Sequence, residues 1–222
     1  MRNLLVLIIL FILPNSIFGQ AWIQRTNFGG AGRHRTSSFA IGNRGYIGCG
    51  HVNGLSGVIN YADWWEYDPA SDSWTQKANY PTVNYGAISF AAAGKGYVGG
   101  GAFLGSEFYS FNPVTNTWTA IQNCPGSPGD QGCFAVGDKG YVFVGAAVYE
   151  YNAITGNWTT KQNGPAFGGW CVAFSIGTSG YVKNGAVLYE YKPLYDQWLV
   201  RAAFPGMNTN GGAALARNGK GY

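Results

Sequence analysis

The sequence contains few charged side chains and no long uninterrupted apolar segment. Asp, Glu, Lys and Arg make up only 11% of the 222 residues, which excludes a charged helical protein. The net charge of +4 is spread along the chain, so no basic stripe suits phosphate groups and we expect no nucleic acid partner. The longest apolar run, residues 4–13, is about half of the roughly 20 residues that cross a bilayer. We therefore expect no membrane span in the mature protein.

Motifs that carry common enzymatic chemistry are also missing. The sequence has no C-x-x-C, H-x-x-x-H, phosphate-binding loop or G-x-S-x-G. Asp and Glu total 10, and several are turn residues such as Asp68, so a glycosidase carboxylate pair has few candidates. From these absences we expect no catalytic residue, no cofactor and no bound metal, and we favour a non-catalytic protein.

The N-terminal residues have the pattern of a signal peptide. One positive charge in residues 1–3 precedes the apolar run, which is broken by Pro14, Asn15 and Ser16. Cleavage is expected after Gly19, and no Cys follows the run to accept a lipid. We predict a leader over residues 1–19 and a mature protein that is secreted or held at the cell surface, without a membrane span.

A repeat of about 40 residues organises the rest of the chain. The composition of 35 Gly and 16% aromatic residues favours an all-β fold. Tryptophans recur at intervals of 44, 40 and 40 residues, and each follows an aromatic by seven residues. A Gly-Tyr pair follows each Trp by 23 or 24 residues. The Trp and Tyr markers are Trp22, Trp74, Trp118, Trp158, Trp198, Tyr46, Tyr97, Tyr141, Tyr181 and Tyr222.

Each repeat is predicted to form four short strands. Examples are residues 38–41 for the first strand, 97–101 for the second, 64–67 for the third and 73–77 for the fourth. Four antiparallel strands per 40 residues are typical of a propeller blade. A single blade cannot cover both of its faces, so blades stack, with Trp and Tyr filling the gap between them. Glycines of the second strand would let neighbouring sheets approach closely near the axis.

Paired glycines follow Gly-Tyr, and Tyr67-Asp68-Pro69 precedes Trp74. With these motifs the repeat resembles the kelch repeat of secreted bacterial proteins and of galactose-oxidase-like propellers. Residues 41–48 and 65–69 are similar to those blades, as are the Arg33-His34 and Ser37-Ser38 dipeptides. The resemblance covers residues 20–222 and implies an all-β, kelch-type β-propeller of four-stranded antiparallel blades, with four complete blades plus partial terminal strands.

The ends of the repeat array point to an incomplete ring. Trp22 is predicted to lie on a lone fourth strand, and about residues 210–222 are predicted to open a further blade. Since kelch rings usually have six or seven blades, the resemblance implies a copy truncated at its C-terminus. A ring of five with a defective closing blade is the alternative.

The candidate binding site lies in the loops that join fourth to first and second to third strands, because these loops meet on one face of a propeller. Their polar and aromatic side chains suit a carbohydrate or peptide. Ordinary solvated loop residues are the alternative interpretation. The candidates are Arg33, His34, Arg35, His51, Asn84, Tyr85, Asp130, Gln131, Trp170, Asn208 and Asn210.

Histidines and cysteines give two further hypotheses. His34 and His51 are the only histidines and fall in loops of the same face, so a shared metal ion is an alternative to our expectation of none. The copper-radical oxidases of the resembled family need two His and two Tyr ligands, none of which matches a residue here. Cys124 and Cys133 flank a Pro-Gly-Ser-Pro-Gly loop and could form a disulfide in an exported protein. Cys49 and Cys171 are expected to be buried thiols.

These observations favour a monomeric, extracellular recognition module that binds glycan or protein through one face. The resemblance leaves a second hypothesis, a secreted enzyme of the galactose-oxidase or sialic-acid-mutarotase type whose catalytic residues lie in missing blades. Adhesion or surface display is a third.

Overall fold

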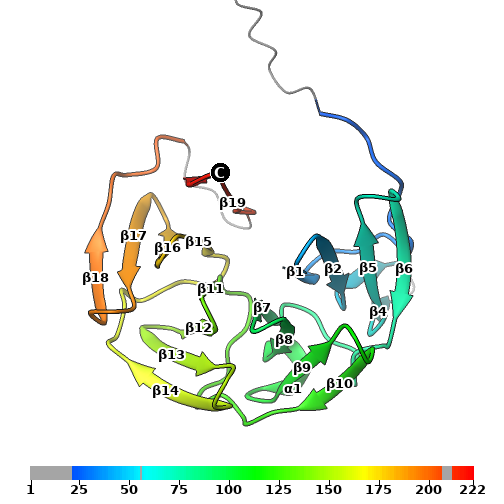
Figure 1. Cartoon of the computed structure of the whole chain (residues 1–222), viewed down its shortest axis with the longest axis horizontal. Coiled ribbons are helices and arrows are strands. Elements are labelled where there is room, and N and C mark those ends of the chain that lie inside the picture. The colour runs from blue at the N-terminus through cyan, green and yellow to red at the C-terminus, as the bar shows by residue number, and fades with distance from the viewer. Residues whose placement is uncertain (1–21, 56, 207–211) are drawn as a thin grey trace, which may run out of the picture.

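The chain forms four four-stranded antiparallel sheets arranged as the blades of a β-propeller (Figure 1). The structure is a computed structural model that describes residues 22–55, 57–206 and 212–222. Each blade consists of four strands that are consecutive in its sheet. Blade 1 contains β1 (Ser37–Ile41), β2 (Arg44–Gly48), β5 (Trp64–Asp68) and β6 (Ser73–Lys77), and blade 2 contains β7 (Ile88–Ala92), β8 (Lys95–Gly99), β9 (Phe108–Asn112) and β10 (Thr117–Ala120). Blade 3 contains β11 (Phe134–Val136), β12 (Lys139–Val144), β13 (Ala147–Asn152) and β14 (Asn157–Lys161), and blade 4 contains β15 (Val172–Ile176), β16 (Ser179–Asn184), β17 (Val187–Lys192) and β18 (Gln197–Val200). A two-stranded sheet of β19 (Ala216–Arg217) and β20 (Lys220–Gly221) follows. The predicted fold class is confirmed, and the first strand of each blade lies nearest the axis (Figure 1).

The marker tryptophans occupy equivalent places, as the repeat predicted. In blade 1, for example, Trp74 of β6 lies directly opposite Tyr67 of β5. The other three pairs have the same register: Phe111 with Trp118, Tyr151 with Trp158 and Tyr191 with Trp198. Each of these three later indoles also donates its Nε1–H to a backbone carbonyl of the preceding blade, namely Ala78, Gln122 and Gln162 at 3.0, 2.9 and 3.4 Å. The tryptophans therefore join neighbouring blades by packing and by hydrogen bonds.

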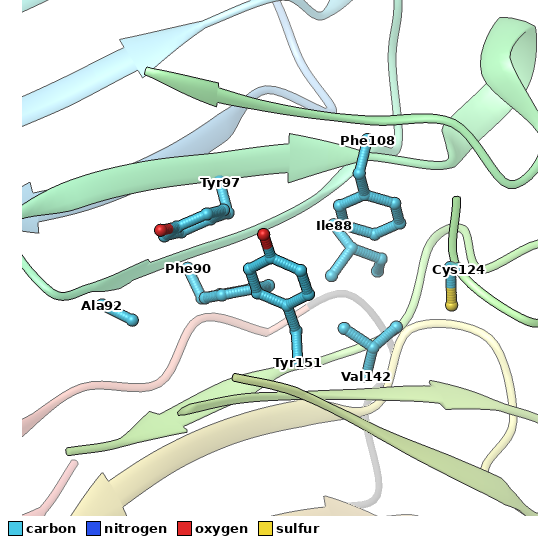
Figure 2. Packing of buried hydrophobic residues seen from close by; sticks show 8 residues of the cluster. All are labelled: Ile88, Phe90, Ala92, Tyr97, Phe108, Cys124, Val142 and Tyr151. Atoms are coloured by element: carbon cyan, nitrogen blue, oxygen red, sulfur yellow. The ribbon is translucent and has the colours of Figure 1, made fainter. Parts of the chain in front are cut away.

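The blades also join through a phenylalanine and a glycine. Between blades 2 and 3, the Phe90 ring stacks on Tyr97 of its own blade at 5.1 Å between centroids, and Tyr151 of the next blade closes over both (Figure 2). The Phe90 ring occupies the space that a Cβ at Gly140 would need. The same pairing recurs at the other contacts between consecutive units, as Phe39 with Gly96, Phe134 with Gly180 and Phe174 with Gly221. The predicted role of second-strand glycine in close approach is thus carried by the glycine of the Gly-Tyr pair.

The predicted strand at Trp22 is wrong. Residues 22–28 form no strand, and Trp22 is fully exposed, because no third strand lies beside it within the described residues. The segment nevertheless contacts blade 1 in the same way as the end of the fourth strand of blade 1 contacts blade 2. The Thr26 N–H donates to Asp72 at 3.1 Å, as the Ala78 N–H donates to Asn116 at 2.9 Å.

Two segments between second and third strands were not predicted. In blade 1 this connection forms a hairpin of β3 (His51–Gly54) and β4 (Gly57–Asn60), and in blade 2 it forms the four-residue helix α1 (Gly101–Leu104). Each segment follows a glycine of positive φ, Gly50 or Gly100, and the second strand predicted over residues 97–101 therefore ends at Gly99. No helix in the described ranges is long and apolar enough to cross a membrane.

A buried carboxylate in blade 4 predicts acid sensitivity. Burial alone would raise the pKa of Glu190, but hydrogen bonds from Lys192, Ser179, Arg201 and Tyr181 outweigh burial and lower this pKa to about 2. A carboxyl whose pKa is depressed on folding stabilises the protein above its unfolded pKa, and this stability is lost as pH falls toward the folded value.

We therefore expect stability to fall as pH is lowered from about 4.5 to about 2. Glu190→Gln should remove up to about 2 kcal/mol of stability at pH 7 and flatten this acid limb. Denaturant titrations of both proteins across the pH range test this. An unchanged acid limb in the variant would contradict it, with Glu107→Gln, which replaces a more exposed carboxylate, as the control.

Candidate functional site

One residue per blade adopts the left-handed conformation where the chain reaches the axis. These residues, here called the axial ladder, are Arg35, Gly86, Asp130 and Trp170, with φ of 56°, 64°, 51° and 69°. Each lies four positions before the inner-strand phenylalanine of its blade. Their backbones are hydrogen-bonded in sequence: N–H of Gly86 to O of Arg35 at 3.0 Å, Asp130 to Gly86 at 2.8 Å, and Trp170 to Asp130 at 2.5 Å. These backbone hydrogen bonds therefore join the four blades around one opening at the axis, here called the mouth of the propeller.

The residue types of the ladder point to function. A positive φ is favourable for glycine, which blade 2 uses, and is strained for bulky side chains. Blades 1, 3 and 4 instead place an Arg, an Asp and a Trp at this conformation. Strain of this kind, on the order of 1–3 kcal/mol per residue, gathers at functional sites. Arg35, Asp130 and Trp170 are therefore the centre of the candidate site.

The Arg35 guanidinium of blade 1 pairs with the Asp130 carboxylate of blade 3. The pair is bidentate, with Arg35 Nε donating to Asp130 Oδ1 at 2.9 Å and Nη2 bonding Oδ2. Gly86 of blade 2 lies between them, and a Cβ there would overlap the carboxylate and lie 3.0 Å from Arg35 Nη2. Because Gly86 has no side chain, the ion pair has room to form at this position. About a quarter of each side chain is exposed.

Aromatic and amide groups surround this pair. The Arg35 guanidinium lies 4.4 Å from the ring centroid of Tyr85 and 5.1 Å from that of Trp170. Trp170 remains 44% exposed, so one part of its indole faces solvent. Gln131 donates to the Phe167 carbonyl at 3.1 Å, while its buried Oε1 has no hydrogen-bond partner. A cavity of about 450 Å³ lies at this point, and its lining includes Arg35, Asp130, Gln131, Trp170, His34 and Thr36.

Two predicted binding residues serve the scaffold instead. The Arg33 side chain is only 2% exposed; it forms a bidentate pair with Asp63, with Nη2 2.9 Å from Oδ2, and stacks on Tyr61. Asn84 is fully buried and donates to the Gly100 carbonyl at 2.9 Å. Both hold the connection between second and third strands, so neither is free to contact a ligand. Asn208 and Asn210 lie outside the described residues.

The predicted disulfide between Cys124 and Cys133 is also wrong, since all four cysteines are free thiols. Cys124 packs between blades 2 and 3 (Figure 2), whereas Cys133 directs its Sγ to the Ser89 carbonyl at 2.9 Å. Burial raises the pKa of the Cys124 and Cys133 thiols to about 11 and about 12, which leaves both protonated and unreactive. Cys49 and Cys171 are buried, as predicted.

The two histidines are brought together, as their loops suggested. The rings of His34 and His51 are 4.2 Å apart between centroids in a T-shaped arrangement, and the Tyr85 ring centroid lies 4.0 Å from that of His51. Among the described residues, no group of three or more His, Cys, Asp or Glu side chains could hold a metal ion.

Comparison with known proteins shows the fold and no more. No protein-family model matches the chain, and no curated protein matches it. The chain is similar to the solved structure of YjhT, with a TM-score of 0.74 and 18% identity over 90% of this chain and 78% of that one. This likeness supports a β-propeller, and membership of the kelch family stays a prediction.

Sequence reasoning placed Arg35, Asp130 and Trp170 on one face but missed what unites them. It did not identify Gly86 as their counterpart in blade 2. The signal was present, because the residue four positions before Phe39, Phe90, Phe134 and Phe174 is the ladder residue in every blade. The inner-strand phenylalanine is thus a fourth marker of the repeat, and the ladder residue stands at a fixed distance before it.

Proposed function

We propose that this chain is an exported recognition module that binds uncharged carbohydrate at the mouth of the propeller. The observation that carries this proposal is the placement of three chemically different side chains, Arg35, Asp130 and Trp170, on left-handed backbone around one cavity at the axis. The signal-peptide pattern of residues 1–19 supports export.

The chemistry of the cavity favours a neutral, hydroxyl-rich ligand. Arg35 and Asp130 neutralise one another, so an ionic ligand would have to break a bidentate pair. The pair still offers N–H donors and carboxylate acceptors, which suit the hydroxyl groups of a sugar. The exposed part of Trp170 offers an apolar surface for the C–H face of a pyranose, and the unpartnered Gln131 Oε1 can accept from a further hydroxyl.

Binding to a neutral oligosaccharide array, followed by calorimetry, tests the proposal. We expect Trp170→Ala to weaken binding by about 10-fold or more through loss of the stacking surface. Arg35→Ala should weaken binding further, because it removes ligand contacts and leaves Asp130 without its partner. Tyr195→Ala, which removes a 71% exposed aromatic from an outer turn, is the matched control and should leave affinity unchanged.

Two results would overturn the carbohydrate assignment. One is the absence of any neutral saccharide ligand for the folded full-length chain. The other is an affinity that Trp170→Ala and Arg35→Ala leave unchanged. A protein ligand captured through the same two residues would keep the site and replace the ligand class.

A further inference from the structure

A row of three polar side chains crosses the base of the β3–β4 hairpin. His34 and His51 form an antiparallel bridge, with both backbone N–O distances at 3.0 Å. His51 of β3 is in turn directly opposite Asn60 of β4. Directly opposite residues of antiparallel strands point to the same face, with Cβ atoms about 4.5–5.5 Å apart. The side chains of His34, His51 and Asn60 therefore lie side by side on one face.

The buried atoms of this row have no hydrogen-bond partner. His51 is only 5% exposed, and neither its Nδ1 nor its Nε2 is bonded. The Asn60 Oδ1 is likewise buried and unbonded. Each buried unsatisfied polar group costs about 1–3 kcal/mol, and native proteins leave few of them. Three such atoms on two facing residues are therefore available to bind a ligand.

The donor atoms suit a divalent transition metal. His34 and His51 each offer an imidazole, and a neutral imidazole is the form that binds metals. Imidazole nitrogens are preferred ligands of Zn²⁺, Cu²⁺ and Ni²⁺, and an amide oxygen can complete the set. The charge of Arg35 is balanced by Asp130, and the exposed His34 gives access from solvent.

We propose that His34, His51 and Asn60 bind one divalent transition-metal ion, with Zn²⁺ as the representative cation and solvent completing its coordination. Metal binding at these residues requires no carbohydrate, although His34 also lines the axial cavity. A bound ion would fix the β3–β4 hairpin against the mouth of the propeller.

Calorimetry of chelator-treated full-length protein with ZnCl₂ tests this proposal without any saccharide. We expect one saturable site of about micromolar affinity, weakened about 100-fold by His51→Gln and by His34→Gln, and about 10-fold by Asn60→Ala. Asn53→Ala, on an exposed position of the same hairpin, is the matched control and should bind as the unaltered protein does. NMR gives a second readout, because both histidine ring signals should shift together when Zn²⁺ is added.

The result that would overturn the proposal is binding that is absent or weaker than about millimolar, or that survives both histidine substitutions. An experimental structure obtained in Zn²⁺ with only a water between His51 and Asn60 would overturn it as well. His34→Gln alters an exposed side chain, so its loss of binding can be read even if His51→Gln fails to fold.

Discussion

Gly140→Ala is expected to lower the free energy of unfolding by about 3 kcal/mol or more. The new Cβ would overlap the Phe90 ring, which is buried between blades 2 and 3 and held by Tyr97 and Tyr151 (Figure 2). Overpacking of a well-packed interior costs about 1–3 kcal/mol and more where the neighbour cannot move. Denaturant unfolding, followed by tryptophan fluorescence, measures the change.

Gly45→Ala is the matched control for this experiment. Gly45 holds the same place in the second strand of blade 1, but no phenylalanine packs there, and the nearest atom to its added Cβ is the Tyr67 Cβ at 3.9 Å. We expect a change between zero and a stabilisation of about 1 kcal/mol, because alanine is better than glycine within a strand. Equal losses at Gly45 and Gly140 would show that the inserted ring is not what requires glycine.

Arg33→Ala is expected to destabilise the fold by about 3–5 kcal/mol. The substitution leaves the Asp63 carboxylate, which is largely withdrawn from water, without its guanidinium partner. It also removes the stacking of that guanidinium on Tyr61, 3.7 Å from the ring centroid. The loss should be visible as a lower unfolding midpoint and, since Asp63 anchors the β3–β4 connection, as faster amide exchange in that hairpin.

Arg44→Ala provides the comparison. Arg44 pairs with Asp68 at the surface, where 42% of the arginine side chain is exposed, and a pair of this kind contributes about 0–1 kcal/mol. If Arg33→Ala lowers the free energy of unfolding by no more than Arg44→Ala, the structural role of Arg33 is contradicted, and Arg33 again becomes a candidate ligand contact.

The repeat allowed most of the fold to be predicted from sequence. The period of Trp74, Trp118, Trp158 and Trp198 is typical of stacked units of the same kind, and these residues occupy equivalent strands. The predictions failed where a residue depends on a neighbour outside its own repeat. Trp22 forms no strand because strand formation needs a hydrogen-bonding partner, which a single segment cannot supply.

The site could be predicted only by region. Loop position placed Arg35, Asp130 and Trp170 on one face, but it could not distinguish them from Arg33, which is two residues away from Arg35 and faces Asp63. Whether a loop side chain faces solvent depends on backbone angles, and the left-handed conformation at Arg35 has no signature in a single residue. The short spacing of Cys124 and Cys133 was equally uninformative, because side-chain direction and not separation along the chain decides whether a disulfide forms.

The pairing of Phe90 with Gly140 has an evolutionary consequence. The phenylalanine and the glycine lie on opposite faces of every blade, so each blade binds the next through two different surfaces, head to tail. Such a heterologous interface generates a closed ring when the rotation from one blade to the next divides a full turn evenly. Duplicating or deleting one 40-residue unit would leave each remaining phenylalanine facing a glycine. Blade number in such a lineage can therefore change by recombination without any new interface having to evolve.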